Sequence, residues 1–312
     1  MPEGALEDVR DHQQGVFTPN QARTSGMSRR DIDFLVRGGS WERLRRGVYA
    51  EQPVRDDEPN ALHLQVAAAR LALSGQGVCS HETAALLHGL PVRRVRDSRV
   101  ILTMPSSQRS HRDFEGIHVH RASLPTTHVA TVANFPATSL ARTLVDLGRN
   151  RSVGAALIPL DHALHQHLVT CAELNAVLQD CRRWPGIKKA SEVVGFGDTR
   201  SESPLESLGR LCLHRHDLPM PVLQHEIVLQ GGQRTRVDFY WEDGGVIGEA
   251  DGLGKYTDPA VLRAEKLRQE QQEAMGFIVV RFTWVDITGH PGRTAGRFLA
   301  ALARGRARAS AS

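Results

Sequence analysis

The residues best suited to chemistry are three carboxylates in two short segments, RVDFYW at 236–241 and VIGEADG at 246–252. Side chains alternate along a strand, so Glu249 and Asp251 share one face, and Asp238 points away from its aromatic neighbours. The sequence EDGG at 242–245 is typical of a hairpin and would bring Asp238 beside Glu249. Gathered carboxylates repel one another and are costly to desolvate, and Mg²⁺ or Mn²⁺ is the simplest compensation. The pattern therefore predicts a divalent-cation site.

The elements that would position these carboxylates follow from periodicity and capping signals in residues 201–305. A helix begins at SESPLES, where Ser203 caps the end and Pro204 takes the first helical position. Strands are predicted at 222–229, 234–241 and 245–251, followed by a charged helix over 259–275, a strand over 277–283 and a helix over 293–304. This order, αβββαβα, is that of the restriction-endonuclease-like folds.

Several strings in this segment carry a family resemblance: SPLES, RVDFYW, VIGEADGLGKY, EKLRQE and GFIVVRFTWVD. Together they resemble a family of nuclease-like domains related to the very short patch repair endonucleases, in the PD-(D/E)XK superfamily. The resemblance covers nearly all of 201–290. It implies that Asp238 and Glu249 are metal ligands and that Glu206 completes the metal site. It also implies phosphodiester hydrolysis by a metal-activated water.

One position departs from the superfamily pattern. Asp251 stands where (D/E)-x-K places a lysine, so the resemblance implies that the cationic role moves to Lys255, Lys266 or Arg268. Lys266 and Arg268 have an alternative role as solvated partners of Glu270 and its neighbours in the same helix.

Two further residues of the segment have open assignments. Ser203-x-x-Glu206 has the spacing of a capping box, so Glu206 has a structural alternative to catalysis. Arg281 lies in a buried strand and is expected to pair with Glu249 or Asp238, or to contact phosphate.

Residues 1–50 have the element order of a winged helix-turn-helix: helices over 6–12, from Pro19 and over 29–37, then the hairpin WERLRRGVYA at 41–50. The third helix of such a domain enters the major groove of double-stranded DNA. Its exposed face and the wing would supply the DNA contacts: Arg29, Arg30, Arg37, Arg43, Arg45 and Arg46. An ordinary solvated charged face is the alternative.

A family resemblance covers the same segment, from Gly15 to Tyr49. It rests on the pattern G-x-F-T-x-x-Q-A, G-x-S and G-x-W-x-R-x-x-R-G-V-Y, which resembles the N-terminal domain of AbiEi antitoxins. This resemblance implies a DNA-binding autoregulator.

Residues 60–198 follow an acidic, proline-containing linker and are predicted to form a mixed α/β middle region. The phrases SHETAALLHGLP and TSLARTLVDL are also similar to larger AbiEi-like proteins and carry no assigned chemistry. His118 and His120 share one face of a strand, but no cysteine or carboxylate at zinc-ligand spacing accompanies them. We expect no metal there.

The composition bounds the class of protein. The chain has 312 residues, is 40% hydrophobic and carries a net charge of +4, which suits two or three globular domains and argues only weakly for nucleic acid. Its four cysteines lack CxxC spacing, and neither a signal peptide nor a membrane span is recognisable, which indicates a cytoplasmic protein with reduced thiols.

The sequence therefore predicts an α+β multidomain protein with a winged helix at 1–50, a mixed region at 60–198 and a nuclease-like core at 201–305. The leading hypothesis is a Mg²⁺-dependent DNA endonuclease or nickase in phage defence, toxin–antitoxin biology or repair. The alternative is a transcriptional autoregulator or antitoxin with an inactive nuclease fold, whose partners are DNA and a cognate toxin.

Overall fold

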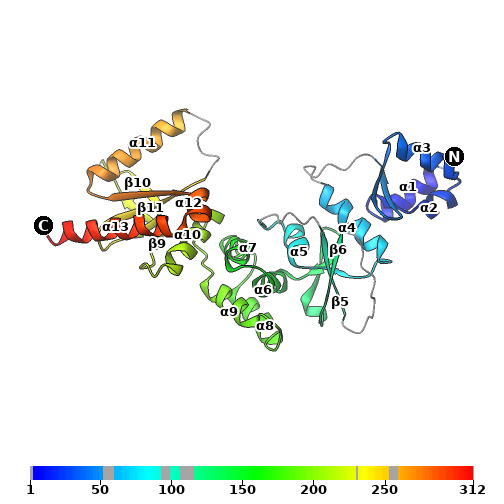
Figure 1. Ribbon diagram of the computed structural model, residues 1–312, viewed down its shortest axis with the longest axis horizontal. Coiled ribbons are helices and arrows are strands. Elements are labelled where there is room, and N and C mark those ends of the chain that lie inside the picture. Colours follow the sequence, from blue (N-terminus) through cyan, green and yellow to red (C-terminus); the bar gives the residue numbers. More distant parts are fainter. Residues whose placement is uncertain are drawn as a thin grey trace. The chain divides into compact units, whose positions relative to one another are not determined.

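The computed structural model describes residues 3–51, 60–92, 99–105, 116–229, 231–252 and 259–311. Contacts divide the chain into two compact units, one of residues 1–89 and 93–146, the other of 90–92 and 147–312 (Figure 1). This division differs from the three expected segments because the winged helix and the first part of the middle region share a core. Among the described residues, no helix is both long and apolar enough to span a membrane.

The first unit opens with the predicted three helices and hairpin. Thr18 and Ser28 each form a full capping box, which fixes where the second and third helices begin. Phe17 packs edge-on against Trp41, with ring centroids 4.5 Å apart, and these rings centre a small core. The sheet order is β1-β3-β2. The elements are α1 (Glu3–His12), β1 (Val16–Phe17), α2 (Pro19–Thr24), α3 (Arg29–Arg37), β2 (Trp41–Arg45) and β3 (Val48–Glu51).

Helix α4 (Ala61–Ala72) connects the winged helix to a five-stranded sheet of order β6-β5-β4-β8-β7. Val16, Val48 and Ala50 of the winged helix lie in one buried cluster with α4 and the sheet residues Leu102 and Phe135. Strands β4, β7 and β8 were not predicted, because they are only two to four residues long. The elements are β4 (Val78–Cys79), α5 (His81–Leu87), β5 (Val100–Met104), β6 (Ile117–Arg121), β7 (Val129–Val132), β8 (Phe135–Thr138) and α6 (Leu140–Asn150).

The phrase TSLARTLVDL has a structural explanation. Arg142 Nε donates to Asp146 Oδ2 at 2.7 Å, and both side chains are 1% exposed. Arg142 Nη1 also lies 3.0 Å from Nδ1 of the buried His128. A buried ion pair is stable only when its hydrogen-bonding groups have partners, and Arg142 finds them in Asp146 and His128. These contacts join α6 to the segment before β7.

The second unit begins with helices and ends with a four-stranded sheet of order β12-β11-β10-β9, in which β11 and β12 are parallel. Strand β11 is buried along its whole length, because central strands are covered on both faces. Glu249 and Asp251 are therefore buried, as is the intervening Ala250. The elements are α7 (Val153–His165), α8 (Cys171–Asp180), α9 (Ile187–Phe196), α10 (Pro204–Arg215), β9 (Val222–Val228), β10 (Arg234–Trp241), β11 (Val246–Asp251), α11 (Pro259–Ala274), β12 (Ile278–Thr283), α12 (Trp284–Gly289) and α13 (Pro291–Ala309).

Candidate functional site

The outward face of α3 is the first candidate site. Ile32 is buried and Leu35 and Val36 pack beside it, as helical periodicity predicted. The opposite face is exposed and comprises Arg29, Arg30, Asp33, Phe34 and Arg37. The three arginines were expected on this face, and Phe34 was missed. Its spacing from Arg30 and Arg37, four and three residues along the helix, is the signal that could have identified it.

The wing presents two of its three arginines to solvent. Arg43 and Arg46 are exposed, whereas Arg45 is half-buried. Arg45 Nη2 lies 3.5 Å from Gln65 Oε1 on α4, and its guanidinium rests against Gly116, where a Cβ would lie 2.6 Å from Nη1. Arg45 therefore contacts α4 and Gly116 within the first unit, and Arg43 and Arg46 are the exposed cations of the wing.

The second candidate site is an acidic cluster where α10, β9, β10 and β11 meet. Gln224 Nε2 donates to Glu206 Oε2 at 2.8 Å and to Asp238 Oδ1 at 3.4 Å, so one amide bridges two carboxylates. Asp238 Oδ2 also accepts the Ala250 N–H at 2.8 Å. Phe239 pairs with Gly248, and this register continues towards Asp238 and Glu249 as the hairpin signal predicted.

Gln224 holds its bridging position at a conformational cost. Its φ is +53°, in the left-handed region that a non-glycine residue rarely occupies within a strand. Such backbone strain persists only where the surrounding contacts fix it. The sequence assigned Gln224 no role.

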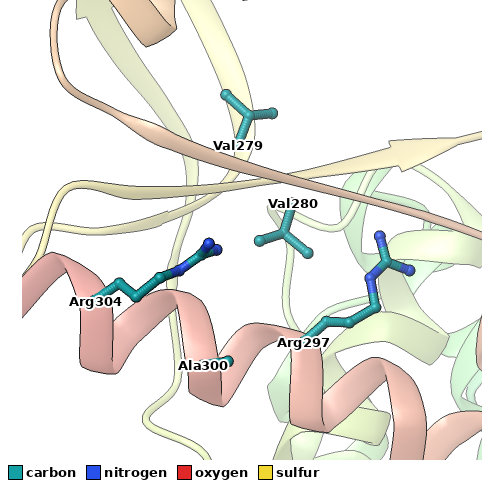
Figure 2. A pocket seen from close by; sticks show the side chains of 5 residues that line it. All are labelled: Val279, Val280, Arg297, Ala300 and Arg304. Carbon is teal, nitrogen blue, oxygen red and sulfur yellow. The ribbon is translucent and has the colours of Figure 1, made fainter.

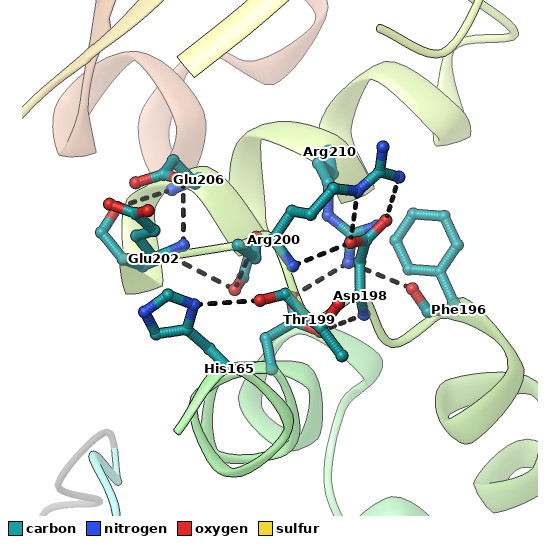
Figure 3. A network of polar contacts seen from close by, with 12 residues as sticks. His165, Phe196, Asp198, Thr199, Arg200, Glu202, Glu206 and Arg210 are labelled. Atoms are coloured by element: carbon teal, nitrogen blue, oxygen red, sulfur yellow. Dashed lines mark hydrogen bonds and ion pairs between the residues drawn. The ribbon is translucent and has the colours of Figure 1, made fainter. Parts of the chain in front are cut away.

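Glu206 is held at the start of α10 in a way that partly differs from the expected capping box. Ser203 Oγ accepts the Glu206 N–H at 3.2 Å, as expected. The Glu206 carboxylate, however, accepts the N–H of Glu202 at 3.0 Å, one residue before the cap (Figure 3). Burial, together with the negative charge of Asp238, raises the pKa of Glu206 above its usual value.

Asp251 is bound by Arg281, a pairing that the sequence did not predict. Arg281 Nη1 donates to both carboxylate oxygens of Asp251, at 3.0 and 3.2 Å, and its Nε donates to Gln269 Oε1 at 3.0 Å. Asp251 was not among the partners predicted for Arg281. The acid at the position where a lysine was expected is therefore neutralised by a cation from the neighbouring strand.

Another candidate for the cationic role pairs within its own helix. Lys266 is exposed and lies 3.9 Å from Glu270 one turn along α11, which is the solvated pairing considered as its alternative. Lys255 lies outside the described residues. Within the described ranges, no group of three or more His, Cys, Asp or Glu side chains is placed to hold a metal ion. Of the acids predicted to bind metal, Glu206 and Asp238 are brought together by the bridging amide of Gln224.

The helices before α10 meet in a second charged network, which is structural. Arg210 Nη2 donates to Asp161 Oδ2 and to the Phe196 carbonyl, both at 3.0 Å, and its guanidinium lies 4.7 Å from the centre of the Phe196 ring (Figure 3). Nearby, His165 Nδ1 lies 2.9 Å from the Thr199 carbonyl. Arg210 and Asp161 are buried and bonded within the protein, so they stabilise the packing of α7 and α10.

An open pocket between β12 and α13 holds cations and no acids. Its lining residues are Val279, Val280, Arg297, Ala300 and Arg304, and the two guanidinium groups flank Val280 (Figure 2). Arg297 forms an ion pair with Asp286, and its Nη2 donates a hydrogen bond to the Arg281 carbonyl. The pocket therefore adds no group for acid–base or metal chemistry to the acidic cluster.

Three histidines gather on the sheet of the first unit. The rings of His81 and His120 stack with centroids 4.0 Å apart, and His118 meets His120 edge-on at 4.5 Å. His81 is buried beside Ser80, whose hydroxyl accepts from Thr103 at 2.8 Å. The sequence paired only His118 with His120, because the contact with His81 depends on how β5 joins β6 to α5.

Comparison with known protein families gives two matches. Residues 5–52 match the family described as "Transcriptional regulator, AbiEi antitoxin", and residues 76–196 match the "AbiEi antitoxin C-terminal domain". The first range contains the winged helix. Neither range extends into 201–305, where the nuclease-like core was expected.

Two curated proteins of Mycobacterium tuberculosis, the uncharacterized proteins MT2308 and Rv2248, are each 31% identical to this chain over 280 residues. Those alignments cover 90% of this chain and 99% of each relative. Among solved structures, the RV2827C protein from Mycobacterium tuberculosis matches with a TM-score of 0.44 and 16% identity, over 72% of this chain and 88% of that one.

Proposed function

The chain belongs to one family with these two Mycobacterium tuberculosis proteins and carries both AbiEi antitoxin domains, and from this premise we propose that it is a DNA-binding transcriptional autoregulator and antitoxin. This was the alternative of the sequence analysis, and the family matches favour it over the nuclease hypothesis.

The observation that carries the DNA-binding part is the exposed face of α3. A helix of this length, capped at Ser28 and flanked by a hairpin, is the element that a winged helix-turn-helix places in the major groove. Arg29, Arg30 and Arg37 on that face, with Arg43 and Arg46 on the wing, supply positive charge for phosphates and base edges.

The proposed protein partner is a cognate toxin. This part rests on the description of the family matched by residues 76–196. Co-expression of the chain with a candidate toxin should restore growth that the toxin alone arrests, and a chain that never neutralises any such toxin would be a regulator only.

The DNA-binding proposal is tested by comparing the exposed and inward arginines of the wing. The double variant Arg43→Ala, Arg46→Ala should bind all duplex sequences more weakly, with a salt-dependence slope smaller by about two, because each phosphate contact contributes about one. Arg45→Ala is the matched control, since its guanidinium lies on Gln65 of α4, and it should leave that slope unchanged. Equal slopes for the double variant and the wild type would contradict the proposal.

A metal-dependent endonuclease or nickase is the second candidate function. The bridging of Glu206 and Asp238 by Gln224 favours it, because paired carboxylates on adjacent elements are what such chemistry needs. The Arg281 ion pair at Asp251 counts against it, because it neutralises the acid that stands where the superfamily has a lysine, so we derive no catalytic step.

The assay for the second candidate incubates the chain with supercoiled plasmid and with mismatched duplex, in Mg²⁺, in Mn²⁺ and in EDTA. We expect binding without cleavage under all three conditions. Metal-dependent nicking that Asp238→Asn abolishes would establish the endonuclease instead, and with it a role in phage defence or repair.

A further inference from the structure

An aromatic side chain stands on the DNA-facing side of α3. Phe34 is 75% exposed, more than any other large hydrophobic side chain in the described part of the chain. Helix α3 lies at the outer surface of the winged helix (Figure 1). Its core side is formed by Ile32, Leu35 and Val36, so Asp33 and Phe34, which lie between Ile32 and Leu35 in the sequence, point outward.

Phe34 is flanked by cations along one stripe of the helix. Arg30, Phe34 and Arg37 are spaced i, i+4 and i+7, which places them one above another on the same face. All three are exposed, and this stripe is opposite the core side of α3. A large apolar group is thereby held at the centre of the surface that would meet DNA.

The chemistry of the major groove narrows what Phe34 can recognise there. Phosphates and most base edges offer charge or hydrogen bonds, which a phenyl ring cannot use. The C5-methyl group of thymine is the apolar feature of the groove, and phenylalanine is among the side chains that contact it. Arginines one turn to either side are placed to bind phosphate or guanine and so to hold the ring against the groove.

We propose that Phe34 is a specificity-determining residue that reads a thymine methyl group in the major groove, between bases or phosphates bound by Arg30 and Arg37. The inference rests on the proposed DNA-binding function and deepens it by naming a feature of the target sequence. An isolated exposed hydrophobic residue is common on protein surfaces, so the proposal depends on the position of Phe34 within the cationic stripe.

The experiment removes the methyl group without altering any Watson–Crick hydrogen bond. Wild-type protein first enriches a duplex from a pool with a randomised centre, and the enriched duplex is resynthesised with single deoxyuridine-for-thymidine replacements at each position. Binding of each duplex is then measured for the wild type, Phe34→Ala and Arg30→Ala. The control variant Leu299→Ala removes an exposed hydrophobic side chain from α13 in the other unit.

At one thymine position or more, the wild type should bind the deoxyuridine duplex about fourfold more weakly, the factor expected for one buried methyl group. Phe34→Ala should bind thymidine and deoxyuridine duplexes equally, at the weaker level. Arg30→Ala should weaken binding to both and keep their ratio, and Leu299→Ala should match the wild type.

Three outcomes would overturn the proposal in distinguishable ways. Salt-sensitive binding without enrichment of any duplex, or with no effect of deoxyuridine, refutes the thymine readout and leaves the proposed function intact. A deoxyuridine effect that persists in Phe34→Ala assigns the methyl contact to another residue. A chain that binds no duplex at all refutes the proposed function and this inference together.

Discussion

Replacing Asp251 with asparagine tests whether the acidic cluster is stabilised by its own cation. In the structure the Asp251 carboxylate receives two hydrogen bonds from Arg281, at 3.0 and 3.2 Å, and the two side chains are 9% and 23% exposed. Asp251→Asn keeps the size of the side chain and one carbonyl acceptor, but it removes the negative charge. The variant should therefore unfold more easily, whether or not a divalent cation is present.

The size of the effect follows from the degree of burial. Exposed ion pairs contribute about 0–1 kcal/mol, and breaking a fully buried pair costs about 3–5 kcal/mol. Asp251 is nearly buried but Arg281 keeps some contact with water, so the free energy of unfolding should fall by about 2 kcal/mol. This corresponds to roughly a thirtyfold change in the unfolding equilibrium constant.

Urea unfolding followed by tryptophan fluorescence suits this measurement, because Trp184, Trp241 and Trp284 belong to the second unit and one further tryptophan to the first. Asp238→Asn is the matched control. Its amide keeps an acceptor for the Ala250 N–H and loses the longer bond from Gln224, at 3.4 Å, while it removes a charge that repels Glu206, so stability should change less than in Asp251→Asn.

The reasoning would be refuted by the reverse pattern. If Mg²⁺ markedly stabilises the wild type, and if Asp251→Asn unfolds like the wild type without metal, then the carboxylates form a cation site and Arg281 is not their main counter-charge.

Three further predictions concern the same molecule. Because the pKa of Glu206 is raised above 4.5 in the folded state, the folded protein binds this proton more tightly than the unfolded chain, and the free energy of unfolding should fall as pH rises from about 4.5 through the raised pKa. Glu206→Gln should abolish that fall when unfolding is measured from about pH 4 to 8. A pH profile that the substitution leaves unchanged would contradict the assignment to Glu206. Elemental analysis of protein purified without chelator should find no stoichiometric zinc, and one zinc per chain lost in His118→Ala or His120→Ala would overturn this. Binding to duplex DNA should weaken by about three orders of magnitude or more between 50 and 200 mM salt if six phosphates are contacted, and salt-independent binding would exclude a phosphate interface.

The sequence predicted best those elements whose limits are set locally. The α3 bounds follow from Ser28 and the Gly38-Gly39 pair, and β10 follows from strict alternation, so both were predicted to the residue. Short strands such as β4 were missed, because two residues carry no periodicity and their pairing is decided by distant partners. Helix α12 begins directly after β12 and was also missed. Its capping box starts at Thr283, which the sequence assigned to the end of a strand.

The candidate sites show the same limit. Alternation and the hairpin correctly brought the β10 and β11 segments together, but the partners of individual side chains depend on tertiary packing. Gln224 reaches Glu206 through a strained backbone, and Arg281 reaches Asp251 across a parallel pair of strands formed by segments about thirty residues apart. Neither contact has a local sequence signal, so the sequence identified the acids and Arg281 as a possible partner, but it did not identify Asp251 as the acid that Arg281 binds.

The shared core of the winged helix and the five-stranded sheet has a practical and a regulatory consequence. Because Val16, Val48 and Ala50 are covered by α4 and its neighbours, a fragment ending at residue 50 would expose an apolar surface. A ligand that shifts α4 would also displace the hairpin packed on it, since closely packed interiors transmit small movements. The proposed DNA-binding face of this chain thus shares its core with α4 and the five-stranded sheet, so we expect a ligand bound elsewhere on this unit to alter how that face meets DNA.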